Sequence, residues 1–133
     1  RRALNKYVSD LKDVTDQYEM LFTKRAEEME LNRHPNERIT DKANLVNEAN
    51  HLIQRLQGFN PPSSLTGMHQ DSLIYFSKVK DWLNLELSYV RTTDEKFQVD
   101  ANKLIPEIEA RGTLLNRSIA KVESLNNLKA IKD

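Results

Sequence analysis

Apolar side chains recur at every third or fourth position along nearly the whole chain, from Leu4 to Ile131. This spacing places them on one side of an α-helix, whereas a half-buried strand alternates apolar and polar residues with a period of two. The pattern therefore predicts an all-α fold. In the first segment the apolar repeat consists of Leu4, Tyr7, Val8, Leu11, Val14, Tyr18, Leu21, Phe22 and Met29.

Three interruptions divide the apolar repeat into segments. Pro35 ends the first helix, because proline disfavours helical geometry in the residue before it. Gly58 is the expected residue just past a helix C-terminus, and Pro61 and Pro62 then form a stiff, extended connection. Residues 92–95 have the spacing of a helix capping box, which places the third connection there. The expected helices cover residues 2–32, 37–57, 64–91 and 94–130, to within a few residues.

The third connection has an alternative position. The apolar phase continues without a slip beyond residues 92–95, so one helix reaching Leu104 and broken at Pro106 fits the periodicity equally well. A break near Thr92 gives the third and fourth helices lengths that pair with the first. Pro106 then lies inside the fourth helix and is expected to kink it. Four helices with short connections predict a single domain over residues 1–133, an antiparallel up-down-up-down four-helix bundle with long helices.

Composition and charge narrow the functional classes. The 133 residues suffice for one domain with a hydrophobic core. The chain has 20 basic and 20 acidic residues, which argues against nucleic acid as a partner because nucleic-acid-binding domains are usually basic. The absence of cysteine excludes disulfides, thiolate metal ligands and thiol nucleophiles. A group of mixed charges is interpreted as a solvated helix face; it comprises Lys24, Arg25, Glu27, Glu28, Glu30 and Arg33.

Metal chemistry is poorly supported by the residues. A di-metal bundle needs inward-facing glutamates on two helices and a Glu-x-x-His motif on each of the two others. The chain has one such spacing, Glu48 to His51, and both residues lie off the apolar seam that contains Leu45 and Ala49. A metal-dependent enzyme centred on Glu48, His51 and His69 is therefore the least favoured hypothesis. Since no nucleophile–base pair or glycine-rich phosphate loop is evident either, we expect no catalytic residues, metal or cofactor.

Two features of the third expected helix are candidates for a site. His69 takes an inward position in phase with Phe76 and Leu83, and we interpret it as a structural polar residue hydrogen-bonded to a neighbour. A stripe with a spacing of seven widens the apolar face of the same helix. Core packing is the favoured interpretation of the stripe, and a surface for a partner helix, peptide or glycan is the functional alternative. Its members are Met68, Tyr75, Trp82 and Tyr89.

The segment from Phe59 to Gln70, in which a proline pair precedes Leu65 and then His69, resembles a helix start in uncharacterised domains of bacterial exported proteins and lipoproteins. These helical-bundle domains come mainly from Gram-positive organisms, and residues 7–13 are similar to their long first helix. The resemblance implies an extracytoplasmic, membrane-tethered module whose tether lies before Arg1. Spectrin-type repeats are a looser match through residues 79–83, against which stand the proline pair and the fourth helix.

We therefore expect a non-enzymatic spacer or interaction module of a bacterial cell-envelope protein, extracytoplasmic and associated with the envelope. Its partner would be an unknown protein or envelope component, with membrane contact only through a tether outside this chain. We expect a monomer or a weak homodimer. The alternative is an intracellular, cytoplasmic scaffold of the coiled-coil or spectrin type that pairs with partner helices, because the heptad-like apolar phase is unbroken from Leu65 to Val122.

Overall fold

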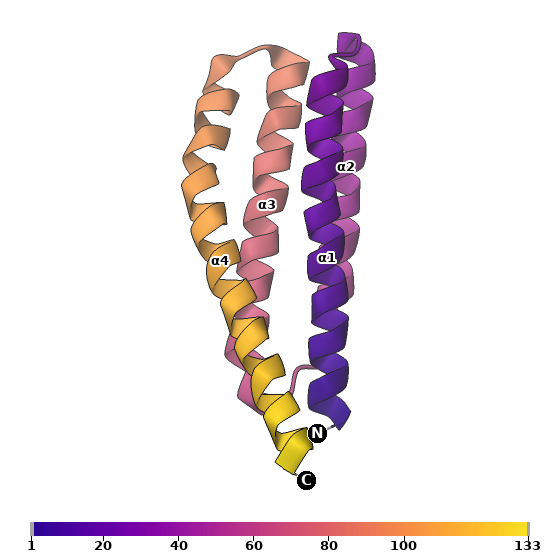
Figure 1. Cartoon of the computed structure of the whole chain (residues 1–133). Coiled ribbons are helices and arrows are strands. Elements are labelled where there is room, and N and C mark those ends of the chain that lie inside the picture. Colours follow the sequence, from indigo (N-terminus) through magenta and orange to yellow (C-terminus); the bar gives the residue numbers. More distant parts are fainter. Residues whose placement is uncertain (1, 133) are drawn as a thin grey trace.

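Four long helices make up almost all of the chain, and the computed structural model describes residues 2–132, with side chains as far as Leu125. The elements are α1 (Arg2–Leu31), α2 (Pro35–Gln57), the short 3-10 helix η1 (Ser63–Leu65), α3 (Thr66–Thr92) and α4 (Glu95–Lys132). Residues 2–132 contain no strand, and successive helices run in opposite directions (Figure 1). The predicted all-α, up-down-up-down four-helix bundle is confirmed. The observed helix ends lie within two residues of the expected positions.

The connections follow from capping chemistry. His34 precedes α2, and its Nδ1 accepts a hydrogen bond from the Asn36 backbone N–H (3.3 Å). The capping box predicted at residues 92–95 is wrong in its details. Thr93 adopts a left-handed backbone conformation (φ 58°) just after α3, and Asp94 Oδ1 accepts a hydrogen bond from the Lys96 N–H (3.0 Å). Asp94, rather than residue 92, therefore caps α4.

The hydrophobic core is centred on α1, α2 and α3. Tyr18 of α1 stacks on Phe76 of α3 with ring centroids 4.0 Å apart, and its hydroxyl donates to the Ala49 carbonyl of α2 (2.8 Å). This single side chain links three helices, and burial raises its pKa well above the usual tyrosine value. The buried apolar residues are Tyr7, Val8, Leu11, Val14, Tyr18, Leu21, Leu45, Ala49, Leu52, Ile53, Leu56, Leu65, Phe76, Val79, Trp82, Leu83, Leu87, Ala101, Ile108, Leu115 and Ile119.

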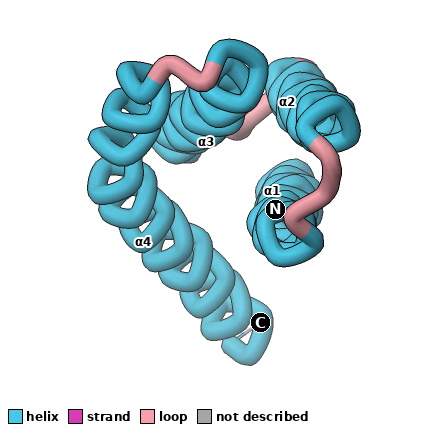
Figure 2. The backbone as a smooth tube through the Cα atoms, turned by 90° about the horizontal axis from the view of Figure 1, so that it is seen from above, coloured by secondary structure: helices cyan, strands magenta, loops and turns pink. Residues whose placement is uncertain are grey.

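The bundle is open between its first and last helices. Seen from above, α1, α2 and α3 are neighbours in sequence order, and α4 starts beside α3 and crosses the remaining side diagonally (Figure 2). α4 contacts α1 closely only near the lower end, where Lys12 Nζ lies 3.6 Å from Glu123 Oε1. α4 continues through Pro106 as one helix and bows outward (Figure 1). Because an interior proline removes one helical hydrogen bond, it favours such a bend, which the sequence predicted.

Candidate functional site: an aromatic cleft beside a buried ion cluster

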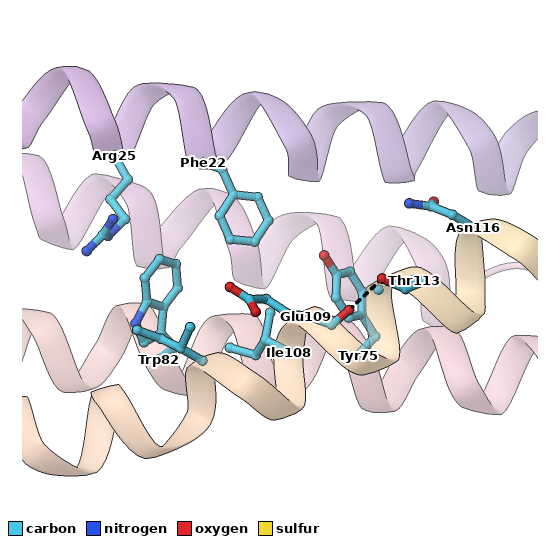
Figure 3. A pocket seen from close by; sticks show the side chains of 10 residues that line it. Phe22, Arg25, Tyr75, Trp82, Ile108, Glu109, Thr113 and Asn116 are labelled. Carbon is cyan, nitrogen blue, oxygen red and sulfur yellow. Dashed lines mark hydrogen bonds between the residues drawn. The ribbon is translucent and has the colours of Figure 1, made fainter.

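A cleft lies on the open side of the bundle between α1, α3 and α4. It has a volume of about 500 Å³, and its polar and apolar side chains come from all three helices (Figure 3). The cleft lies above the lower end of the bundle, where α4 has not yet reached α1 (Figures 1 and 2). We call it the aromatic cleft; its lining residues are Phe22, Arg25, Tyr75, Trp82, Ile105, Ile108, Glu109, Gly112, Thr113 and Asn116.

Three aromatic rings form the walls of the aromatic cleft. Phe22 of α1 lies against Trp82 of α3, with ring centroids 5.7 Å apart at 32°. Tyr75 of α3 is half-buried, and burial raises the pKa of its hydroxyl, with a further rise from the Glu19 carboxylate. Its ring approaches the backbone of α4 at Gly112, where a Cβ atom would lie only 3.0 Å from Tyr75 Cε1. Because Gly112 has no side chain, the Tyr75 ring can pack directly against the backbone of α4.

Arg25 closes one end of the aromatic cleft and pairs with a carboxylate of α3. Its guanidinium carbon lies 4.3 Å from the Trp82 ring centroid, a cation–π distance. Its Nε and Nη2 donate to the two carboxylate oxygens of Glu86 at 2.8 and 2.5 Å. This fork-shaped pair raises the pKa of Arg25, chiefly through the hydrogen bonds to Glu86, even though burial acts in the opposite direction.

Behind Arg25 lies a group of charges that we call the ion cluster: Arg25, Glu28, Arg38, Lys42 and Glu86. Lys42 of α2 is 1% exposed and Glu28 of α1 is 5% exposed. Lys42 Nζ lies 2.9 Å from Glu28 Oε2 and 3.3 Å from Glu86 Oε1, and Arg38 Nε lies 3.1 Å from Glu28 Oε1. The Lys42–Glu28 contact is an ion pair without hydrogen-bond alignment, since Glu28 Oε2 has no hydrogen-bond partner. Three cations therefore share two carboxylates.

The ion cluster corrects the interpretation of residues 24–33 as a solvated face. Lys24 does reach the surface, where it pairs with Glu48 at 3.0 Å, but Glu28 is buried and Arg25 is partly buried. Their partners come from α2 and α3, which local charge spacing does not reveal. A phase signal was nevertheless present, because Glu28 follows the core residue Leu21 by seven positions and so shares its helix face.

The structure separates the four residues of the predicted stripe. Tyr75 and Trp82 both line the aromatic cleft, and Trp82 is only 6% exposed. Tyr89 lies instead beside a smaller cavity of about 110 Å³, next to the ion cluster. Met68 packs against the core near the start of α3. The stripe is therefore not one continuous exposed surface, and its two central residues belong to a site completed by α1 and α4.

His69 is half-buried and hydrogen-bonded to a side chain of another helix. Its Nδ1 lies 2.9 Å from the Tyr7 hydroxyl of α1, and the two rings are 5.7 Å apart between centroids. Burial lowers the pKa of His69 and raises that of Tyr7 to about 12. This arrangement favours a neutral imidazole whose Nδ1 accepts a hydrogen bond from the Tyr7 hydroxyl. His69 therefore links α3 to α1 far from the aromatic cleft.

The residues on α1 and α4 were the part of the site that sequence reasoning missed. Phe22 was assigned to the core seam, and Arg25 to a solvated face, whereas both line the aromatic cleft. Glu109, Thr113 and Asn116 gave no signal in a sequence rich in surface polar residues. Gly112 did offer a signal, because a glycine inside a long helix costs about 1 kcal/mol relative to alanine and often marks a close approach.

Among the side chains that the structure describes, no group of three or more His, Cys, Asp or Glu residues is arranged to hold a metal ion. His51 is exposed, and the nearby Glu48 carboxylate faces Lys24 rather than a second histidine. None of the described helices is both long and apolar enough to cross a membrane. Fold and site together define an all-α four-helix protein with one aromatic cleft on its open side. Comparisons with protein-family models, curated proteins and solved structures give no match to this chain.

Proposed function

We propose that this chain is a non-enzymatic binding module and that its ligand or partner enters the aromatic cleft. The observation that carries the proposal is the separation of α4 from α1, which leaves Phe22, Tyr75 and Trp82 around a space of about 500 Å³. Small-molecule sites in proteins typically measure about 300–1,000 Å³ and combine an apolar lining with a few polar groups. The aromatic cleft has both properties.

Energetics favour a binding role over a role as a simple spacer. Burial of apolar surface contributes about 25 cal/mol per Å², so a bundle that served only as a spacer would gain stability by closing α4 onto α1. Pro106 and Gly112 instead favour an α4 that is bent and carries no side chain against Tyr75. Both residues weaken the helix intrinsically. The presence of Pro106 and Gly112 is explained if the open side of the bundle binds a ligand or a partner.

We also propose that the module acts outside the cytoplasm, at a bacterial cell envelope. This part rests on the similarity of residues 59–70 to helix starts in exported helical domains. Fractionation of the source cells, with an antibody against this domain, tests the compartment. Recovery of the full-length protein with the membrane or wall fraction is expected, and recovery from the cytosol would refute this part of the proposal.

The binding role is tested by placing a photo-crosslinking amino acid at Asn116, on the rim of the aromatic cleft. The matched control carries the same amino acid at Gln54, an exposed position of α2 away from the cleft. After irradiation of the full-length protein in its source cells, intact-mass spectrometry detects adducts of any size, from a small molecule to a protein. We expect an adduct specific to position 116. The same adducts at both positions, or none at 116, would contradict the binding role.

A further inference from the structure

The charges around the aromatic cleft do not cancel. Glu109 lines the cleft, and its carboxylate has no ion-pair or hydrogen-bond partner among the described residues. Figure 3 shows it extending from α4 into the space toward α1. Glu19 on α1 is close enough to raise the pKa of Tyr75 and is likewise unpaired within the described part of the chain. Arg25, the cation that lines the cleft, is hydrogen-bonded to Glu86, a carboxylate that it shares with Lys42. Taken together, the ion cluster, Glu19 and Glu109 contain four carboxylates and three cations.

The aromatic walls of the cleft, like its unpaired carboxylates, favour a cation. Aromatic faces attract cations within about 6 Å of the ring centroid, and the preference is strongest for tryptophan. The protein itself already uses this interaction, because the Arg25 guanidinium lies 4.3 Å from the Trp82 centroid. Phe22 and Tyr75 provide two further rings, and they line the cleft together with the unpaired carboxylate of Glu109. Glu19 adds negative charge near Tyr75, whose pKa it raises. An anion in the same space would be repelled by the carboxylate of Glu109.

The cleft is too small to enclose a helix. Three turns of α-helix with side chains are about 16 Å long and 10–12 Å wide, which corresponds to more than about 1,000 Å³. The cleft offers about 500 Å³, and α4 returns to α1 below it at the Lys12–Glu123 pair. A compact molecule is the kind of occupant that this cleft can enclose.

We propose that the aromatic cleft binds a small organic cation, an alkylated ammonium group on an apolar body. The ammonium lies among Phe22, Tyr75 and Glu109, with Glu19 adding to the negative potential. The apolar body packs on Ile105 and Ile108, which line the same cleft. This inference deepens the proposed binding function and rests on it.

The experiment is a fluorescence titration of the purified chain, because Trp82 is its only tryptophan and lies in the cleft wall. The probes are choline and its uncharged isostere 3,3-dimethylbutan-1-ol, with propanesulfonate as the anion. Choline is expected to bind at least tenfold more tightly than the isostere, with affinity that falls as sodium chloride rises. Propanesulfonate is expected to leave the emission unchanged.

Single-residue variants test whether choline binds in the aromatic cleft. Glu109→Gln is expected to weaken choline binding about tenfold, and Glu19→Gln to weaken it less. Glu30→Gln, which removes an exposed carboxylate of α1 outside the cleft, is expected to have no effect. Circular dichroism confirms that each variant is folded.

The outcomes separate the ligand class from the binding role. Equal affinity for choline and its isostere would overturn the cation proposal and leave a cleft that binds apolar molecules. Binding of propanesulfonate alone, or of none of the three probes, would also overturn the cation proposal. An unchanged choline affinity in Glu109→Gln would do the same. The binding role itself is tested separately, by the crosslink at position 116.

Discussion

At the scale of single residues, Lys42 is a charged side chain that is almost completely buried. A buried charge is tolerated only when it is paired, and Lys42 has two carboxylates within 3.3 Å. Its presence nevertheless leaves the ion cluster with one surplus cation. Without Lys42, Glu28 keeps Arg38 and Glu86 keeps Arg25, so the remaining charges balance. Replacing Lys42 is therefore a different experiment from replacing one of its partners.

We expect Lys42→Met to change the free energy of unfolding by less than about 1 kcal/mol, because an apolar isostere of a buried charge is often neutral or stabilising. Glu28→Leu should destabilise by about 3 kcal/mol, because it leaves Arg38 and Lys42 without their carboxylate. Urea unfolding followed by circular dichroism measures both. A larger loss for Lys42→Met than for Glu28→Leu would show that the lysine, and not its partners, stabilises this part of the bundle.

A second prediction at the residue scale concerns Gly112. Alanine there gains about 1 kcal/mol of helix propensity, but its Cβ would lie 3.0 Å from the Tyr75 ring. The ring borders open space and is able to move into the cleft. We expect Gly112→Ala to unfold at a slightly higher urea concentration and to shift the Trp82 emission. The control, Ser118→Ala at an exposed position of α4, should raise stability by a few tenths of a kcal/mol without altering the emission. Identical emission in both variants would show that Tyr75 does not move.

The environment of His69 predicts that the stability of the folded state depends on pH. Its pKa in the folded state is lowered from 6.5 by burial, so the folded state binds a proton less readily than the unfolded chain. Stability is therefore complete above pH 6.5 and falls as the pH drops below it. Protonation also removes the acceptor for the Tyr7 hydroxyl. Urea midpoints at pH 7.5 and 5.0 should differ less in His69→Gln than in the native chain, whereas exposed His51→Gln should keep the native difference.

At the scale of the helix, Pro106 sets the course of α4. The residue lacks an N–H, so the carbonyl one turn earlier loses its helical partner and the helix bows outward. Pro106→Ala restores the missing donor. We expect a rise of about 1–3 kcal/mol in the free energy of unfolding and a shorter distance between α1 and α4.

That distance is measurable because the chain has no cysteine. Spin labels on cysteines introduced at Ala26 and Gln98, exposed positions of α1 and α4, report it by pulsed electron paramagnetic resonance. A control pair at Asn44 and Ala26 spans α1 and α2 and should not change. If the α1–α4 distance is the same with and without Pro106, the bow has another cause.

At the scale of the whole molecule, the four-helix architecture was predictable and the site was not. Apolar periodicity and the breaks at Pro35, Gly58 and residues 92–95 are local signals, and they placed every helix end within two residues. The aromatic cleft depends on how far α4 lies from α1, which no local pattern encodes. Tyr75 and Trp82 were noticed through their spacing, whereas Arg25 was misassigned because its partner Glu86 lies 61 residues away. Pairings over such separations arise from the packing of helices.

The same geometry predicts an unequal distribution of stability. α1, α2 and α3 enclose the main core around Tyr18 and Phe76, whereas α4 packs chiefly on α3 and meets α1 closely only near the lower end, where the described residues include the Lys12–Glu123 ion pair. Exposed ion pairs contribute at most about 1 kcal/mol. Because α4 packs chiefly on one neighbour, it can open while α1, α2 and α3 stay packed, and native-state hydrogen exchange should show it. We expect amides of α4 to exchange through an opening of lower free energy than those of α1 to α3. Exchange of all four helices at one common free energy would mean that the bundle opens only as a whole and that α4 is held as firmly as the core.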